Sequence, residues 1–219
     1  MAKPLKLLVT GFGPFPGIHV NPTDRLARLL ARSGRFRRMG IAIEAHVFPT
    51  RWATVARDLP DVLKTTKPDA VLHLGVAGRR RKISVEMFAR PSPSAISPDA
   101  GGKSAAPASR KGAALLRRIA APAAPLLNAL EKAGSASHLS HTAGRYLCNA
   151  IYHQSLSLRA EARDKRPTVF IHVPMPGPAR ASLPLSRVRS RKPGERATLK
   201  GLEEALLVLA RAARSAQNG

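Results

Sequence analysis

Short apolar runs along the chain alternate with longer segments that have apolar residues at helical spacing. Residues 5–10, 70–74 and 167–173 are compact apolar runs, which are typical of strands buried in a sheet. Residues 41–48 alternate apolar and polar side chains, and this pattern predicts a further strand. Residues 82–89 and 136–140 are expected to form shorter strands.

The segments between these runs predict helices. Pro22 suits the first position of a helix that continues over residues 24–32, where leucines form one stripe. Residues 52–65, 125–133 and 148–162 predict three more helices, with Pro60 as a candidate interruption in the first. Residues 195–213 carry the clearest helical stripe in the chain.

The alternation of strands and helices predicts the architecture. We expect an α/β fold in which a twisted, mostly parallel (mixed) sheet carries helices on both faces, as a three-layer sandwich. Two stretches interrupt the pattern: residues 91–114 are rich in Pro, Ser, Ala and Gly, and residues 180–193 are basic and irregular. No boundary divides the sequence, so residues 1–219 are expected to form a single domain.

The charge balance is unusual. The chain has 37 Lys and Arg residues against 13 Asp and Glu residues, a net charge of +24. Such a field attracts polyanions, so binding to nucleic acid is an open alternative. Aromatic residues make up only 4% of the chain, and none interleave with the arginine clusters to form a stacking platform. A salt-sensitive, non-specific affinity for nucleic acid is therefore the most that the charge predicts. The clusters comprise Arg35, Arg37 and Arg38; Arg79, Arg80, Arg81 and Lys82; and Arg187, Arg189, Arg191 and Lys192.

Cysteine content and hydrophobic run length give the expected location. Apolar runs stay below the ~18–20 residues that a membrane span needs. The opening apolar segment is too short for a signal peptide, and the chain has one cysteine. We therefore expect a cytoplasmic protein without a membrane partner.

That cysteine, Cys148, is a candidate nucleophile. It follows a turn containing Gly144 and begins a predicted helix, where the helix dipole favours a thiolate. A small buried apolar role is the alternative for a lone cysteine.

Two further residues supply matching chemistry. His172 ends a predicted buried strand, and Glu86 lies in an apolar setting where a carboxylate needs a partner. A cysteine, a histidine and a carboxylate together are the usual groups for acyl transfer. A histidine bonded only to backbone remains the alternative for His172, and His141 and His153 are nearer to Cys148 in sequence.

The loop at residues 11–17 allows two interpretations. Gly11-Phe12-Gly13 after a strand is similar to the opening of a dinucleotide-binding loop. Pro14 and Pro16 remove backbone donors that a pyrophosphate would need, and two phenylalanines crowd the same place. A small, flat, mostly apolar ligand suits the loop better.

Four motifs together resemble the pyrrolidone carboxyl peptidase family (pyroglutamyl peptidase, type I). They run in order from about residue 6 to residue 175 and comprise Leu8-Val9-Thr10-Gly11-Phe12-Gly13-Pro14-Phe15 followed by Asn21-Pro22; Gly75-Val76-Ala77-Gly78 through Ile83-Ser84-Val85-Glu86; Thr142-Ala143-Gly144-Arg145-Tyr146-Leu147-Cys148-Asn149; and Phe170-Ile171-His172-Val173-Pro174.

The resemblance implies a cysteine exopeptidase that removes N-terminal pyroglutamyl (5-oxoproline) residues through a thioester. It implies Cys148 as nucleophile, His172 as general base and acid, and Glu86 as the residue that orients the imidazole. It also implies that no metal or cofactor is required. A homo-oligomer is an alternative to a monomer, provided that the positive charge faces outward. The matching substrate-binding residues are Phe12, Phe15, Asn21, Val76 and Tyr146.

The sequence departs from the family pattern near the motifs but not at the three reactive residues. Arg79 stands where the family usually has glycine, and Val85 and Met87 flank Glu86 in place of proline and a basic residue. Ile96 occupies the place of an arginine ahead of Pro98-Asp99. A catalytically diverged relative that binds polyanions is the second hypothesis, and a nucleotide-binding α/β domain is the third.

Overall fold

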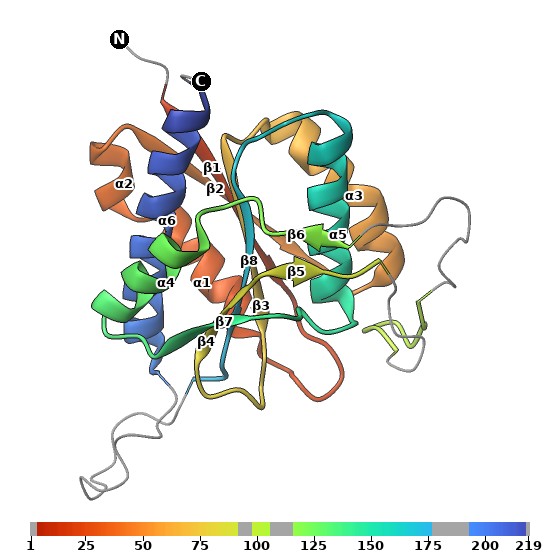
Figure 1. Ribbon diagram of the computed structural model, residues 1–219. Coiled ribbons are helices and arrows are strands. Elements are labelled where there is room, and N and C mark those ends of the chain that lie inside the picture. The colour runs from red at the N-terminus through yellow and green to blue at the C-terminus, as the bar shows by residue number, and fades with distance from the viewer. Residues whose placement is uncertain (1–3, 92–97, 106–115, 177–192, 218–219) are drawn as a thin grey trace, which may run out of the picture.

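A six-stranded sheet forms the centre of the computed structural model, which describes residues 4–91, 98–105, 116–176 and 193–217 (Figure 1). The strand order is β2-β1-β3-β8-β4-β7. A separate two-stranded ribbon, β5-β6, lies beside it. The strands comprise β1 (Leu5–Phe12), β2 (Ile41–Phe48), β3 (Ala70–Val76), β4 (Ile83–Glu86), β5 (Phe88–Ala89), β6 (Arg117–Arg118), β7 (Ser137–Ser140) and β8 (Thr168–Val173).

The sheet is mixed, as the sequence predicts. Strands β2, β1, β3 and β8 run parallel to one another, and β4 runs parallel to β7. The single antiparallel pairing in the described sheet joins β4 to β8. The start of β4 therefore lies beside the end of β8, and Glu86, two residues after Ser84, shares a face of the sheet with His172.

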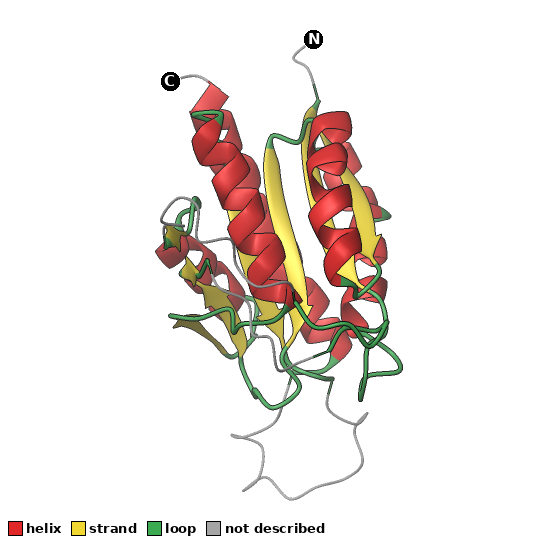
Figure 2. Ribbon diagram, turned by 90° about the vertical axis from the view of Figure 1, so that its right-hand side faces the viewer, coloured by secondary structure: helices red, strands yellow, loops and turns green. Residues whose placement is uncertain are grey.

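Helices cover both faces of the sheet (Figures 1 and 2). One face is covered by α1 (Pro22–Ala31), α2 (Gly34–Arg38), α4 (Ala123–Lys132) and α6 (Glu195–Gln217). The other is covered by α3 (Trp52–Thr66) and α5 (Leu147–Glu161). This is the three-layer α/β arrangement expected from the sequence.

Each face has its own apolar core. On the α1, α4 and α6 side, buried leucines such as Leu26, Leu130 and Leu206 pack against the strands. On the α3 and α5 side, the core is aromatic and includes Phe48 and Phe170. The strong helical stripe of α6 supplies its buried side chains, because residues at that spacing share one face.

Pro60 does not interrupt α3. A proline inside a helix leaves the carbonyl four residues earlier without its usual donor. Here that carbonyl belongs to Ala56, and it accepts a 2.9 Å hydrogen bond from the Gln154 side chain on α5. Helix α3 therefore continues through Pro60, and this hydrogen bond joins it to α5.

Other boundaries differ from the expected ones by a few residues. Helix α2 and strand β6 had no clear signal, because each is very short. The expected irregular segments at residues 91–114 and 180–193 lie mostly outside the described residues, as do Ile96 and the cluster Arg187, Arg189, Arg191 and Lys192. Among the helices described, none is long and apolar enough to cross a membrane.

The arginine clusters are not wholly free for polyanions. Arg35 on α2 pairs with Glu204 on α6 at 2.6 Å, and Arg80 pairs with Glu86 at 2.5 Å. These pairs join separate elements of the fold, so carboxylates of the protein itself neutralise part of the positive charge.

His73 makes stability dependent on pH. Its ring is fully buried on β3, contacts Thr10 Oγ1 through Nδ1 at 2.8 Å and lies 6.2 Å from the Phe170 ring. Burial, and then the nearby Arg159 charge, lower the pKa of His73 to about 3 from an ordinary 6.5.

We predict that stability falls as the pH drops from 6.5 toward 3, because the unfolded chain takes up a proton that folded His73 does not. Urea unfolding across this range measures the slope, and His73→Gln should make it shallower. The substitution His19→Gln, on an exposed loop, is the control. An unchanged slope in His73→Gln would contradict the assignment.

Candidate active site

Three parallel strands bring their carboxyl ends together at one place. The register pairs Thr10 with His73, His73 with Phe170, and Gly75 with His172. Since side chains two apart share a face of a strand, His73, Gly75, Phe170 and His172 all face the α3 and α5 layer. Ligands of open α/β sheets bind at this edge.

Helix α5 places Cys148 over this edge. Tyr146 is the N-cap residue, so Cys148 lies in the first turn. Its sulfur packs against the backbone of Gly75: a Cβ at Gly75 would lie 2.9 Å from Cys148 Sγ and 2.6 Å from Phe170 Cζ. Glycine at this position is therefore what allows the helix to approach the strand.

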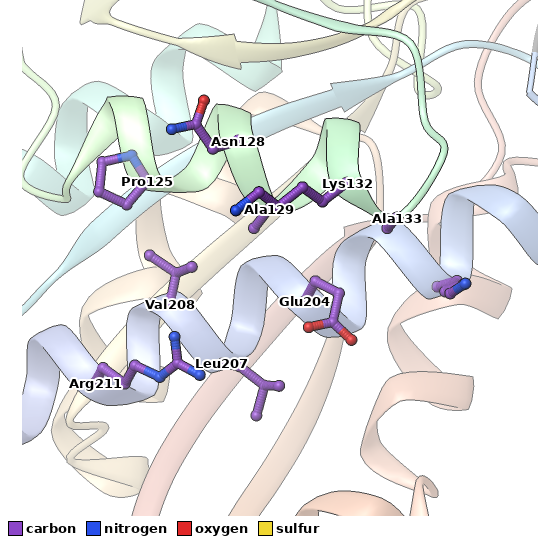
Figure 3. Close-up of a pocket in the computed structure, with 10 residues that line it drawn as sticks. Pro125, Asn128, Ala129, Lys132, Ala133, Glu204, Leu207, Val208 and Arg211 are labelled. Atoms are coloured by element: carbon purple, nitrogen blue, oxygen red, sulfur yellow. The ribbon is translucent and has the colours of Figure 1, made fainter.

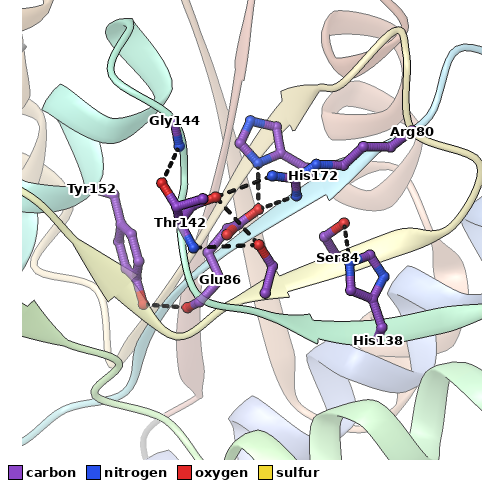
Figure 4. Close-up of polar contacts among 9 residues, drawn as sticks. Arg80, Ser84, Glu86, His138, Thr142, Gly144, Tyr152 and His172 are labelled. Atoms are coloured by element: carbon purple, nitrogen blue, oxygen red, sulfur yellow. Dashed lines mark hydrogen bonds and ion pairs between the residues drawn. The ribbon is translucent and has the colours of Figure 1, made fainter.

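His172 and Glu86 form a direct pair. His172 Nδ1 lies 2.8 Å from Glu86 Oε1, and Glu86 is fully buried (Figure 4). With Nδ1 engaged by the carboxylate, Nε2 is the ring nitrogen left to exchange a proton. The antiparallel pairing of Ser84 with His172 brings the carboxylate to this position.

Arg80 completes the group, although in the sequence it is marked only as a member of a basic cluster. Its Nη1 donates to Glu86 Oε1 at 2.5 Å, and its Nη2 donates to the carbonyl of Thr142 at 3.0 Å (Figure 4). One guanidinium thus joins the β3–β4 connection, the buried carboxylate and the segment that leads to Cys148. Tyr152 adds a hydrogen bond from its hydroxyl to the Glu86 carbonyl at 3.1 Å.

A pocket of about 310 Å³ opens at this edge. It brings together Cys148, His172 and all five residues expected to bind substrate. The lining comprises Phe12, Phe15, Ile18, Asn21, Thr50, Val76, Gly78, Arg79, Ala143, Tyr146, Leu147, Cys148 and His172. Glu86 stands behind His172 and does not line the pocket.

Aromatic rings form one wall of this pocket. The rings of Phe15 and Tyr146 are 6.1 Å apart, and Trp52 meets Tyr146 edge-on at 5.3 Å. The Tyr146 hydroxyl donates to the Pro98 carbonyl at 2.9 Å. Trp52 was assigned only to a helix from its sequence, because its contact with Tyr146 spans distant segments.

Asn21 and Thr50 hold the loop that carries Phe12 and Phe15. Asn21 Oδ1 caps α1 by accepting from the Thr23 amide at 3.1 Å, and its Nδ2 donates to Gly13 O at 3.0 Å. Thr50 Oγ1 donates to the same carbonyl at 2.9 Å. The polar atoms of Asn21 therefore hold the loop, and its side chain also lines the pocket.

The helix start does not favour a resting thiolate, contrary to expectation. Burial, and then the nearby Glu86 charge, raise the pKa of the Cys148 thiol to about 12. The loss of solvation outweighs the dipole of the first helical turn. Cys148 is therefore a neutral thiol at pH 7 unless another group takes its proton.

The other histidines near Cys148 in sequence do not line the pocket. His141 stacks on Phe88 with ring centres 5.9 Å apart, and His153 follows on α5. A second hollow of about 550 Å³ lies between α4 and α6 (Figure 3). Its lining includes Lys132, Glu204 and Arg211 but no cysteine, serine or histidine.

Comparison with known proteins gives a consistent result. A family model described as pyroglutamyl peptidase matches residues 5–182. The pyrrolidone-carboxylate peptidase of Pyrococcus furiosus is 34% identical over 176 residues, which cover 78% of this chain and 81% of that protein. The pyrrolidone-carboxylate peptidase of Gloeobacter violaceus is 32% identical, with 98% of this chain and 99% of that protein covered.

Solved structures agree with these sequence matches. A mutant pyrrolidone carboxyl peptidase from P. furiosus superposes with a TM-score of 0.79 at 27% identity, covering 94% of this chain and 99% of that one. Pyroglutamyl peptidase I from Bacillus amyloliquefaciens gives a TM-score of 0.78 at 25% identity, covering 94% and 97%.

The close packing at Gly75 yields a prediction. Gly75→Ala places a methyl group against Phe170 and the Cys148 sulfur, so we expect a loss of about 1–3 kcal/mol in the free energy of unfolding. Urea denaturation measures this loss. Gly13→Ala is the matched control, because the nearest atom to its Cβ is Phe48 O at 3.8 Å. Equal stability of the two variants would show that α5 can move away from β3.

A second prediction concerns Arg80. Arg80→Met leaves the Glu86 charge buried with His172 as its remaining partner, so unfolding free energy should fall at pH 8. Removing one partner of a fully buried pair costs about 3–5 kcal/mol, and we expect about 2 kcal/mol because the Arg80 side chain is 29% exposed.

Urea denaturation measures this loss, with the exposed Arg145→Met as the control. A loss no larger than that of the control would show that the buried Glu86 carboxylate does not depend on its contact with Arg80.

Proposed function

Because the chain belongs to the pyroglutamyl peptidase family, whose members are cysteine peptidases, we propose that it releases N-terminal pyroglutamyl residues from peptides. The observation that carries this proposal is the shared pocket. Cys148 and His172 line the same aromatic hollow, and Glu86 holds the far nitrogen of His172. These are the groups that acyl transfer through a thioester requires, with the contact between the imidazole and the carboxylate in place.

In the first half of the reaction, Cys148 is the nucleophile. Its thiol transfers its proton to His172 Nε2 as Sγ attacks the pyroglutamyl carbonyl carbon, which forms the C–S bond. The raised thiol pKa means that this transfer is part of the attack instead of preceding it. Glu86 stabilises the imidazolium through the 2.8 Å contact with Nδ1.

In the second half, the same proton leaves with the product. The imidazolium donates it to the amine of the departing peptide as the C–N bond breaks, which leaves a thioester on Cys148. Water, deprotonated by His172, then attacks the thioester and releases free pyroglutamate and the thiol. The steps balance without a metal or an oxidant.

The negative oxygen that forms in both halves lies beside the first turn of α5. The N–H groups of a first helical turn lack carbonyl partners within the helix, and Cys148 is the second residue of α5. Such donors are well placed to stabilise an oxyanion, and each typically lowers the activation barrier by about 3 kcal/mol.

The pocket wall favours a blocked N-terminus. The rings of Phe12, Phe15 and Tyr146 offer apolar surface to the flat lactam, and the lining that the structure describes includes no carboxylate that would bind a free α-ammonium. Bringing that charge into the pocket without a partner would be unfavourable. The neutral lactam avoids this cost, which is why we assign a pyroglutamyl residue and not an ordinary N-terminal residue.

We predict that wild type hydrolyses a fluorogenic pyroglutamyl amide and that Cys148→Ser lowers kcat/KM at least about 10³-fold, because the serine hydroxyl is the weaker nucleophile. Glu86→Gln should also lower kcat strongly, since the amide cannot stabilise the imidazolium. The control is Glu161→Gln, on the exposed end of α5. Full activity of Cys148→Ser would show that Cys148 is not the nucleophile.

The thiol pKa gives a pH prediction. A pKa raised by burial keeps Cys148 protonated at pH 7, and thiolate accumulates only as the pH approaches about 12. In His172→Ala, which has no base to accept the proton, the rate of alkylation by iodoacetamide should be low at pH 7 and rise steadily through pH 10. Mass spectrometry of the single cysteine follows it. Fast alkylation of His172→Ala at pH 7 would argue against His172 as the base.

A further inference from the structure

Arg79 occupies the rim of the pocket. It follows β3 in a turn closed by the hydrogen bond from the Arg80 amide to the Ala77 carbonyl, at 2.9 Å. The two adjacent arginines have different surroundings: Arg80 contacts the buried Glu86, whereas Arg79 is solvent-exposed and lines the pocket with Cys148 and His172.

Among the described residues that line this pocket, Arg79 is the only Lys, Arg, Asp or Glu. All 13 Asp and Glu side chains of the chain lie in the described segments. None of them forms an ion pair with Arg79, although Arg80 and Arg35 each have one. The rim therefore presents a positive charge that the protein itself does not neutralise.

The pyroglutamyl group cannot supply the matching negative charge, because its lactam is neutral. The residue that follows the pyroglutamyl group must leave the pocket toward solvent, and Arg79 is an exposed residue of the same lining. A carboxylate on that residue is the nearest group of the substrate that could pair with the guanidinium.

We propose that Arg79 selects substrates that carry a carboxylate on the residue after the pyroglutamyl group. Two sources supply it: an acidic side chain, or the free C-terminus of a pyroglutamyl dipeptide. This inference rests on the proposed function and adds to it the class of leaving group. An exposed ion pair is worth up to about 1 kcal/mol, so the expected preference is about fivefold in kcat/KM.

Two matched pairs of peptides test the two sources. Pyroglutamyl-glutamate amide against pyroglutamyl-glutamine amide isolates the side chain, and pyroglutamyl-alanine against its amide isolates the C-terminus. In wild type we expect kcat/KM to be about fivefold higher for the charged member of at least one pair. In Arg79→Gln that ratio should fall to about one.

The control separates a local contact from the field of the whole protein. Arg38→Gln removes the same charge from an exposed site on α2, away from the pocket, and should keep the wild-type ratio. A ratio near one in wild type, or the same loss in Arg38→Gln, would overturn the role of Arg79. Hydrolysis of the neutral amides with no charge preference overturns this inference alone, whereas no hydrolysis of any of the four peptides overturns the proposed function as well.

Discussion

A fully buried carboxylate governs the organisation of this protein. Glu86 has no solvent exposure, so its charge requires partners within the fold. Oε1 receives both the Arg80 guanidinium and His172 Nδ1, at 2.5 Å and 2.8 Å. These contacts connect β4, the β3–β4 turn and β8. Arg80 also contacts the carbonyl of Thr142, in the segment that leads directly into the helix that carries Cys148. The same contacts that offset the cost of the buried charge therefore orient the reactive groups.

The sheet places these groups at one edge, and glycine allows them to meet. In the parallel register, Gly75 lies beside His172 on the next strand. Its missing side chain leaves room for the Cys148 sulfur on one side and the Phe170 ring on the other. A helix with a cysteine in its first turn can then rest directly on the strand backbone. Burial raises the pKa of this thiol, so the proposed attack includes proton transfer to the imidazole.

Sequence patterns were sufficient to predict the layers of the fold. Continuous apolar runs marked β1, β3 and β8, because strands buried on both faces have few polar positions. The resemblance to a known family singled out Phe12, Tyr146 and other residues that share one pocket. The carboxylate could be chosen because a charge in an apolar strand needs a partner.

What the sequence could not supply were contacts between distant segments. Nothing local distinguishes Arg80 from its basic neighbours; its 2.5 Å contact arises from the turn that folds it back onto Glu86. The same holds for Thr50 and Trp52, which act through Gly13 and Tyr146. The prediction that the helix dipole favours a Cys148 thiolate was wrong for a related reason. The helix start is visible in the sequence, but the degree of burial that opposes the dipole is a property of the assembled layers.

Tyr146 links the shape of the substrate wall to a loop far from it in sequence. It caps α5, presents its ring to the pocket and anchors its hydroxyl to Pro98. The next residue, Asp99, accepts hydrogen bonds from the amides of Trp52, Gly101 and Lys103. Burial opposes its ionisation, but these amides keep its pKa below the usual value. The aromatic wall and the helix that carries Cys148 are thus held by the same contacts. Relatives that shorten or lengthen this loop would change pocket width and sulfur position together, so substrate size and turnover would evolve as one trait.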